Sequence, residues 1–347
     1  MAYGTVNADV IGTSVAGSNL GAGNASMLKN RIINGAMVID QRNAGASVTQ
    51  TTTTLYPVDR WAIAGSVTSK FTAQQNAGSV TPPIGFVNYL GITSSSAYTV
   101  GAAEYFQVRQ TIEGFNVADL GWGTANAKTI TLSFQVYSSL TGTFGGSIGN
   151  NAGNRSYPFS YSIPVANTWT TVSVTITGDT TGTWLTTNGG GLWVYWGLGV
   201  GSTYSGTAGS WAGADYRSAT GAVSVVGTNG ATFYITGVQL EVGSSATGYE
   251  YRQYGQEFAL CQRYYQSNRI VWSGQTTGAG QAFYAYSPFK VTMRSAPTGT
   301  ITNESLAAMN AGSLTNSAVD SIRYDVTASG SNVNNYAFAT INVSAEL

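Results

Sequence analysis

The sequence contains no histidine and only one cysteine, Cys261. Without histidine, neither a Ser-His-Asp nor a Cys-His catalytic arrangement can form, and the side chain that most often binds zinc, copper or non-haem iron is missing. A single cysteine cannot close a disulfide within the chain or build a thiolate metal cluster. These absences exclude most nucleophilic and transition-metal enzymes.

Charged residues and long apolar runs are also scarce. Lys, Arg, Asp and Glu make up 9% of the chain, the formal net charge is +0, and no basic block occurs. Binding to nucleic acid through phosphate neutralisation is therefore not expected. No apolar run is long enough to predict a membrane span, and the start, MAYGTVNADV, predicts no secretion signal. Because the polar, weakly charged composition is typical of proteins that work outside cells, we expect a protein made in a cytoplasm and released by lysis.

The residues that are abundant favour β structure. Glycine occurs 44 times, proline only 7 times, and aromatic residues make up 12% of the chain, which fits short strands joined by tight turns. Apolar and polar residues alternate in EYFQVRQTI, KTITLSFQVY, RSYPFSYSI, TTVSVTI and ATFYITGVQLEV. The stretch GGGLWVYWGLGVG, at 189–201, is apolar on both faces, as in a central strand. The sequence therefore predicts an all-β fold with an antiparallel β-sandwich.

The two ends of the chain differ from the predicted sandwich. Residues 1–30 are small and polar and cannot bury enough surface to fold alone. Two interpretations stay open: a loose terminus, or an extended arm that orders when it docks on a partner or a neighbouring copy. Residues 267–347 again show β patterns and suffice for a small second β domain. The predicted order is an arm at 1–30, a sandwich at 31–247, a linker at 248–266 and a β domain at 267–347.

The linker GYEYRQYGQEFALCQRYYQ, at 248–266, gathers charges, tyrosines and the cysteine. Its apolar residues, adjacent or spaced three and four apart, are Phe258, Leu260, Cys261, Tyr264 and Tyr265. Glu257 stands early and Arg263 late, as the helix dipole favours. We predict one short amphipathic helix over 255–266.

No motif for catalysis or for a cofactor is present. GLGVGS, at 197–202, lacks the Lys-Ser/Thr of a phosphate loop. Glu104 and Glu113 flank one predicted strand, but their odd spacing places them on opposite faces, which does not suit a glycosidase pair. We expect no enzyme activity, no cofactor and no metal. A calcium site near Asp179 or Asp215 stays open as an alternative, because sandwich loops form such sites without a local motif.

The best candidate binding loop is SWAGADYRSATG, at 210–221, which combines Trp211, Asp215, Tyr216 and Arg217. An exposed ring can stack on the apolar face of a sugar while Asp and Arg bond its hydroxyls. In the alternative interpretation, Trp211 plugs the end of the sandwich and Asp215 and Arg217 form a loop ion pair. Three other tryptophans are expected to be core or rim plugs: Trp122, Trp169 and Trp184.

Two segments together resemble a module of tailed-bacteriophage fibre and minor virion proteins. They are NRIINGAMVIDQRNAG followed by YPVDRW, and ITGVQLEVGSSATGYEYRQYGQEFALCQRYYQ; the ending INVSAEL fits as well. The resemblance covers roughly residues 30–266 and, more loosely, the C-terminal part. It implies an N-terminal segment that attaches to the particle and a jelly-roll-like sandwich, often likened to carbohydrate-binding modules. It also implies a linking helix, a terminal β domain and a homotrimer, but assigns no catalytic or glycan-binding residue.

The resemblance implies a structural role for the linker, as an elbow between domains or around a three-fold axis. The residues expected to pack or pair in this elbow are Glu250, Arg252, Glu257, Phe258, Leu260, Cys261, Arg263, Tyr264 and Tyr265. The implied function is a virion structural protein, a trimeric tail fibre that docks on other virion proteins and presents β domains to host surface glycans. The alternative is a head fibre, capsid decoration or tail-collar protein that binds no receptor.

Overall fold

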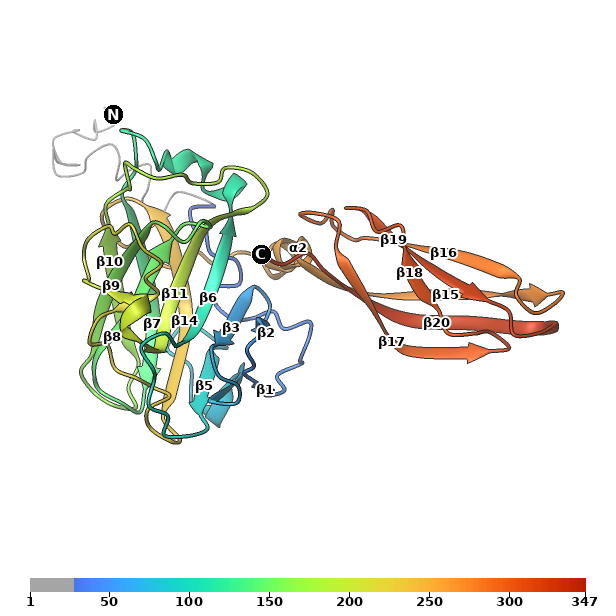
Figure 1. Ribbon diagram of the computed structural model, residues 1–347, viewed down its shortest axis with the longest axis horizontal. Helices are drawn as coiled ribbons and strands as arrows, with labels where there is room; N and C mark the ends of the chain where they lie inside the picture. Colours follow the sequence, from blue (N-terminus) through green and yellow to red (C-terminus); the bar gives the residue numbers. More distant parts are fainter. Residues whose placement is uncertain (1–27) are drawn as a thin grey trace, which may run out of the picture. The chain divides into compact units, whose positions relative to one another are not determined.

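The computed structural model describes residues 28–347, so the predicted arm lies almost wholly outside the described residues. The described chain forms two compact units (Figure 1). The N-terminal unit comprises the described chain up to Val38 together with Gly45–Tyr251. The C-terminal unit comprises Ile39–Ala44 and Arg252–Leu347. The short segment Ile39–Ala44 therefore belongs with residues that lie more than two hundred positions later in the sequence.

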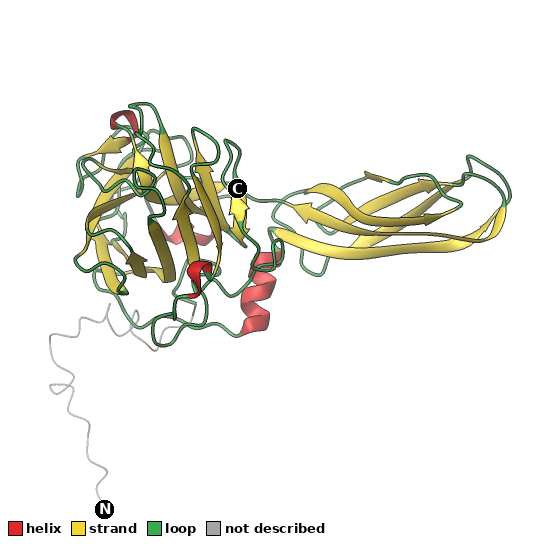
Figure 2. Ribbon diagram, turned by 90° about the horizontal axis from the view of Figure 1, so that it is seen from below, coloured by secondary structure: helices red, strands yellow, loops and turns green. Residues whose placement is uncertain are grey.

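The N-terminal unit is an antiparallel β-sandwich of two six-stranded sheets (Figures 1 and 2). Sheet one has the order β1 (Val48–Thr49), β4 (Phe71–Gln75), β5 (Leu90–Ser94), β14 (Thr232–Val242), β7 (Ile130–Ser138) and β10 (Thr170–Ile176). Sheet two has the order β2 (Leu55–Val58), β3 (Trp61–Gly65), β6 (Tyr105–Glu113), β11 (Gly190–Val200), β8 (Gly142–Gly149) and β9 (Ser156–Ile163). The predicted all-β, jelly-roll-like sandwich is confirmed.

Short elements connect and flank these sheets. Two two-residue strands, β12 (Ser205–Gly206) and β13 (Ser218–Ala219), pair in parallel. The 3-10 turns are η2 (Ala77–Ser79), η3 (Gly114–Asn116), η4 (Ala118–Leu120) and η5 (Ser202–Tyr204). Among residues 28–347, no helix is long and apolar enough to cross a membrane.

Alternation along the strands builds the core between the two sheets. In β7, Leu132, Phe134 and Val136 are fully or almost fully buried, while the residues between them face away from the core. The stretch that is apolar on both faces forms β11, which lies between β6 and β8 in the middle of sheet two, as predicted. Trp196 of β11 contacts Trp61 of β3 across the intervening strand β6, with ring centroids 5.4 Å apart, and also meets Phe134 of sheet one.

Tyr161 is a core residue that carries a polar atom without a partner. Tyr161 on β9 packs against Phe134 and Phe144, and its buried hydroxyl makes no hydrogen bond. Burial raises the pKa of this phenol. We expect Tyr161→Phe to raise the free energy of unfolding by about 1 kcal/mol, because it removes an unsatisfied polar group and keeps the ring. Chemical denaturation of both proteins measures this difference, and a less stable variant would contradict it.

The C-terminal unit contains two three-stranded antiparallel sheets. Sheet three has the order β15 (Tyr265–Thr276), β20 (Asn332–Ser344) and β17 (Thr298–Ala307). Sheet four has the order β16 (Ala282–Pro288), β19 (Ser321–Thr327) and β18 (Ser313–Thr315). Fully buried Tyr324 of β19 and Ile341 of β20 belong to the same apolar cluster, so the two sheets share one core.

Contacts of Arg42 help to tie the segment Ile39–Ala44 into the C-terminal unit. Arg42 donates to Glu346 over 2.7 Å, and both side chains are largely buried. The guanidinium of Arg42 also lies 4.1 Å from the centroid of the Tyr265 ring. The segment Ile39–Ala44 is therefore held to the C-terminal unit by an ion pair and by a cation–π contact.

The helix is shorter than predicted: α2 spans Tyr254–Gln262, whereas the pattern indicated 255–266. It ends because Tyr264 donates its N–H to the carbonyl of Cys261 in a turn, and Tyr265 then pairs with Ser344 in the ladder between β15 and β20. Strand pairing thus replaces helical hydrogen bonding. The expected apolar face is buried only in part: Cys261 is buried, as are Tyr264 and Tyr265 just beyond the helix, whereas Phe258 and Leu260 are half-buried. The other buried helix residues are the polar Glu257 and Gln262.

Candidate functional site

The stretch 210–221 nominated from the sequence follows β12 and runs through β13, and its tryptophan is packed among other rings. The ring of Trp211 lies 5.2 Å from Trp122, 5.6 Å from Trp184 and 5.2 Å from Tyr157, measured between centroids. Its indole N–H donates to the carbonyl of Thr177 over 2.9 Å. These four rings form a cluster, called here the tryptophan cluster, at one end of the sandwich.

The other nominated residues lie apart from this cluster. Arg217 donates to Asp215 over 2.7 Å, and its guanidinium lies 3.9 Å from the Tyr105 ring centroid and 4.8 Å from that of Tyr204. Burial alone would lower the pKa of Arg217, but the bond to Asp215 raises it. Tyr216 packs closely over Gly206. A glycan-binding role for these residues stays a prediction, and the structure brings only Asp215 and Arg217 into contact.

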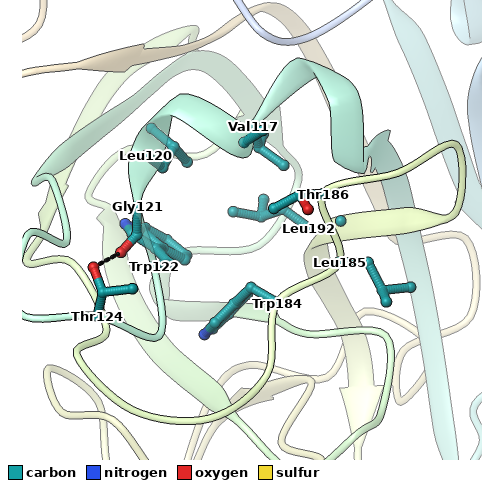
Figure 3. A pocket seen from close by; sticks show the side chains of 11 residues that line it. Val117, Leu120, Gly121, Trp122, Thr124, Trp184, Leu185, Thr186 and Leu192 are labelled. Carbon is teal, nitrogen blue, oxygen red and sulfur yellow. Dashed lines mark hydrogen bonds between the residues drawn. The ribbon is translucent and has the colours of Figure 1, made fainter.

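A small apolar pocket adjoins the tryptophan cluster (Figure 3). Its volume is about 180 Å³, and Leu120, Trp122, Trp184 and Leu192 contribute to its lining. The two indole N–H groups donate to backbone carbonyls, so the apolar parts of the rings are left for the pocket. Thr124 also bonds to the carbonyl of Gly121, as Figure 3 shows. The pocket therefore offers few free polar groups to a hydroxyl-rich ligand.

A larger hollow, called here the groove, lies on the outer face of sheet one and has a volume of about 370 Å³. Its floor includes four polar side chains from β7 and β10: Ser133, Gln135, Thr171 and Ser173. Its wall includes three aromatic side chains from the loops that flank the sheet: Phe86, Tyr249 and Tyr251. Within the part of the chain that the structure describes, no charged side chain belongs to its lining.

Strand register explains the polar floor. Because Phe134 and Val172 point into the core, the residues beside them in β7 and β10 point outwards. Gln135 pairs with Thr171 and Ser133 with Ser173 across the two strands. The Thr171 hydroxyl donates to the Gln135 side-chain carbonyl over 3.0 Å, which holds the amide in place. The floor is therefore two adjacent rows of hydroxyl and amide groups.

A bulge in β14 lets the aromatic wall come close to the sheet. The register between β14 and β7 shifts between Thr236 and Gln239, and Gly237 there has a φ of +61°. A Cβ atom on Gly237 would lie 2.6 Å from the Phe86 ring, so only glycine fits. Phe86 contacts Tyr249 and Tyr251 at centroid distances of 5.1 and 5.6 Å. Tyr251 nevertheless remains 58% exposed, so part of the wall is open to a ligand.

The same sheet face continues beyond the groove as a row of aromatic rings. Tyr137 lies two residues beyond Gln135 on β7 and stacks on Tyr234 with centroids 5.2 Å apart. Trp169 packs at a tilt on Tyr137, with centroids 5.5 Å apart, and donates to the carbonyl of Thr81. The prediction of Trp169 as a rim plug fits this packing. Along β7, the outer face of sheet one therefore changes from aromatic at Tyr137 to polar at Gln135, two residues away.

The groove was not found from the sequence, although its signal is present in the strands. The outward residues of the β7 segment TLSFQVYS are Ser, Gln and Tyr, and the alternation predicted that they face away from the core. The alternation did not predict that β10 lies beside β7, or that residues 84–86 and 246–251 form a wall over them.

Carboxylates of the described residues do not gather into a metal centre. Within residues 28–347, no group of three or more Cys, Asp or Glu side chains could hold a metal ion. Asp179 accepts two hydrogen bonds of 2.7 Å from Arg155, and Asp215 accepts from Arg217. The carboxylates considered for loop calcium are therefore engaged by arginine.

The elbow residues lie as follows. Arg252 and Glu257 form an ion pair of 3.3 Å with both side chains largely buried, and Glu250 accepts from the backbone N–H of Asn30 over 2.7 Å. Cys261, Tyr264 and Tyr265 are buried, whereas Phe258 and Leu260 are half-buried. The carbonyl of Arg263 accepts from the N–H of Arg294. An elbow role in a trimer stays a prediction.

Comparisons with known proteins assign no functional residue of this chain. No protein-family model and no curated protein sequence matches the chain. The enzymatically active domain of tailspike protein 4 from bacteriophage CBA120 is 14% identical, with a TM-score of 0.29, over 53% of this chain and 19% of that chain. A putative sugar-binding protein from Bacteroides thetaiotaomicron is 13% identical, with a TM-score of 0.36, over 62% and 100%.

A family 11 carbohydrate-binding module from Clostridium thermocellum, solved with a β-1,3-1,4-mixed-linked tetrasaccharide, is also similar. It is 9% identical, with a TM-score of 0.28, over 59% of this chain and 99% of that chain. Solved structures similar to this chain thus include carbohydrate-binding modules and a phage tailspike domain. Identities and TM-scores this low transfer no function to this chain.

Proposed function

We propose that the chain is a bacteriophage virion protein whose N-terminal unit binds a host surface glycan in the groove. The observation that carries the glycan proposal is the combination of exposed rings and a polar floor in one hollow of about 370 Å³. That volume lies within the range of ligand sites, about 300–1,000 Å³. Neither the apolar pocket nor the 210–221 loop offers both kinds of group in an open position.

The chemistry of the groove matches a neutral sugar chain. The exposed ring of Tyr251 can stack on the C–H face of a pyranose. Gln135, with the hydroxyls of Thr171 and Ser173, can donate and accept hydrogen bonds to sugar hydroxyls. Because no charged side chain among residues 28–347 lines the groove, an acidic sugar bound there would lack a charged partner in the lining to compensate its desolvation. Neutral glycans are therefore the proposed ligand class.

The virion role rests on the sequence resemblance. The segments ITGVQLEVGSSATGYEYR and LCQRYYQ support a fibre-type protein that docks through its N-terminal arm, assembles as a homotrimer through the elbow and carries a C-terminal β domain. Three copies would convert weak single-site contacts into useful avidity. Gold labelling of intact virions with an antibody against residues 267–347 tests this. Label on tail fibres supports the adhesin, and label on the head or collar favours the purely structural role.

Two substitutions in the full chain test the groove. Tyr251→Ala with Gln135→Ala is expected to weaken binding to a neutral glycan about thirty-fold, since one stacking contact and one hydrogen bond, each worth about 1 kcal/mol, are lost. Calorimetric titration with the best ligand from a glycan array measures the change.

The matched control is Gln74→Ala, a glutamine on β4 of the same sheet that does not line the groove. Unchanged affinity in the double variant would exclude the groove. Release of reducing sugar on incubation would contradict the further proposal that the protein binds glycan without hydrolysing it.

A further inference from the structure

Two exposed tyrosines stand side by side on the C-terminal unit. Tyr284 and Tyr286 on β16 are 56% and 61% exposed, while the residues that alternate with them, Phe283 and Ala285, pack against the core of this unit. Two residues along a strand are about 7 Å apart, so the rings project from the same face of sheet four at that spacing. Large exposed rings leave apolar surface in contact with water, where a ligand can cover it.

An ordered polar network lies directly across from these rings. Tyr284 pairs with Asp325 and Tyr286 with Arg323 in the ladder between β16 and β19. The Nε and Nη2 atoms of Arg323 donate to Asp325 over 2.7 and 2.9 Å, and the hydroxyl of Thr315 on β18 donates to the same carboxylate over 2.7 Å. The guanidinium of Arg323 also lies 4.5 Å from the centroid of the Tyr284 ring.

The electrostatics show that this network is held together. The hydrogen bond to Asp325, and then one to Tyr286, raise the pKa of Arg323. The hydrogen bond from Arg323 lowers the pKa of Asp325. Both groups are charged near neutral pH and cancel each other. The face therefore presents fixed donors and acceptors without a net charge.

We infer that this face of sheet four, formed by Tyr284, Tyr286, Thr315, Arg323 and Asp325, is a second glycan-binding surface. The two rings supply a stacking platform, and the Arg–Asp–Thr network beside them supplies donors and acceptors for hydroxyl groups. This is the chemistry that the sequence suggested for the 210–221 loop, where the tryptophan is instead packed among other rings. On sheet four the rings remain exposed.

The same features select a neutral sugar chain as the occupant. An acidic polymer would need an uncompensated positive charge, and Arg323 is neutralised by Asp325. A second copy of this chain would need a mainly apolar centre to the contact, whereas a polar ion pair lies in the middle of this face. Self-association is therefore a separate outcome of the test.

This surface would add a second contact for each chain. It lies on a different unit from the groove and shares no residue with it. A glycan long enough to meet both surfaces, or two neighbouring glycans on one cell, would then be held with higher avidity than a single site allows. The inference takes only its class of ligand from the proposed function. The residues of the sheet-four face can bind a glycan even if the groove does not, because the two surfaces share no residue.

The test uses the full chain in a background where the groove is disabled by Tyr251→Ala and Gln135→Ala. Soluble dextran, mannan and galactan serve as neutral probes and alginate as an acidic one, each cast in a native affinity gel. We expect this background to keep measurable retardation by a neutral probe. Adding Tyr284→Ala and Tyr286→Ala should then weaken retardation about tenfold or more, because two stacking contacts are lost.

Two controls separate ring loss from misfolding. Tyr284→Phe with Tyr286→Phe keeps both rings and should retain most of the retardation. Tyr336→Ala removes an exposed ring, 41% accessible, from sheet three and should change nothing.

Each result has a defined meaning. The inference is overturned if adding Tyr284→Ala and Tyr286→Ala leaves retardation unchanged, both in the chain with an intact groove and in the chain with the groove disabled. Loss with the sheet-four alanines but none with the groove variants retains it and overturns the groove instead. A change in mass on dilution, seen by sedimentation and removed by the alanines, reassigns the face to self-association. Retardation by alginate alone, or by no probe, contradicts a neutral-glycan surface.

Discussion

Replacing Asp179 by alanine is expected to lower the free energy of unfolding of the N-terminal unit by about 3–5 kcal/mol, because one partner of a buried ion pair is removed. The Asp179 side chain is 2% exposed and accepts two hydrogen bonds of 2.7 Å from the guanidinium of Arg155. Without the carboxylate, the positive charge of Arg155 has lost the partner that compensated its desolvation.

The carboxylate of Asp179 also holds the loops around the tryptophan cluster. It accepts from the backbone N–H and the hydroxyl of Thr181, while the main-chain carbonyl of Asp179 accepts from the N–H of Gly123 over 2.7 Å. Three loop segments therefore meet at one residue. We expect Asp179→Ala to change the fluorescence of Trp122 and Trp184, which flank these loops.

The pH dependence follows from the direction of the pKa shift. Burial alone would raise the pKa of Asp179, but the bonds from Arg155 and Thr181 lower it below its usual value. A lowered pKa stabilises the folded state above the unfolded-state pKa of about 3.9, and this contribution is lost as the pH falls through the folded-state pKa. The stability difference between the parent and Asp179→Ala should therefore be complete at neutral pH and shrink in strong acid.

Urea denaturation at pH 7 and at lower pH measures both effects. The matched control is Asp119→Ala, which removes a carboxylate that pairs with Arg31 over 2.8 Å but is 45% exposed. An exposed pair contributes at most about 1 kcal/mol. Equal losses for Asp119→Ala and Asp179→Ala would show that burial does not decide the contribution of these pairs.

Replacing Trp211 by alanine is expected to destabilise the N-terminal unit by about 3 kcal/mol and to leave glycan affinity unchanged. The ring contacts Trp122, Trp184 and Tyr157, so truncation leaves a cavity among them, as for other aromatic residues in cores. None of these residues lines the groove. The expected loss is at the low end for a tryptophan because Trp211 is only half-buried.

Trp211→Phe separates the two contributions of this side chain. It keeps an aromatic ring in the cluster but removes the N–H that donates to the carbonyl of Thr177. About 1 kcal/mol should be lost for the hydrogen bond, with a smaller packing term. Denaturation and glycan titration are measured on the same samples. Unchanged stability together with abolished binding in Trp211→Ala would assign this ring to the ligand, as the sequence first suggested.

Much of the fold was accessible from local patterns. Side chains alternate across a strand, so Leu132, Phe134 and Val136 had to share one face whatever the tertiary arrangement. The same logic identified β11 as a central strand from a stretch that is apolar on both faces. The helix boundary failed because Tyr264 and Tyr265 fit a helical spacing, while a strand more than seventy residues later supplied a better backbone partner. Local periodicity cannot predict whether a segment continues a helix or pairs with a distant strand.

Candidate sites were less accessible, because binding chemistry here is assembled from distant segments. The sequence pattern pointed to Trp211, Asp215, Tyr216 and Arg217 because they are close together in the chain. The groove instead combines β7, β10 and two loops, and the sheet-four face combines three strands. Strand order and register bring such groups together, and neither can be predicted from a short stretch of sequence.

The sequence by itself determined the all-β class, the core face of the main strands, the absence of histidine and the exclusion of thiolate metal clusters, since these depend on composition and on a period of two. Only the tertiary structure decided which aromatic rings remain exposed. Trp211 is half-buried by the neighbouring rings of Trp122 and Trp184, while Tyr251, Tyr284 and Tyr286 remain exposed. The physical reason is that exposure depends on what packs against a residue, and in this fold those neighbours come from other strands and loops.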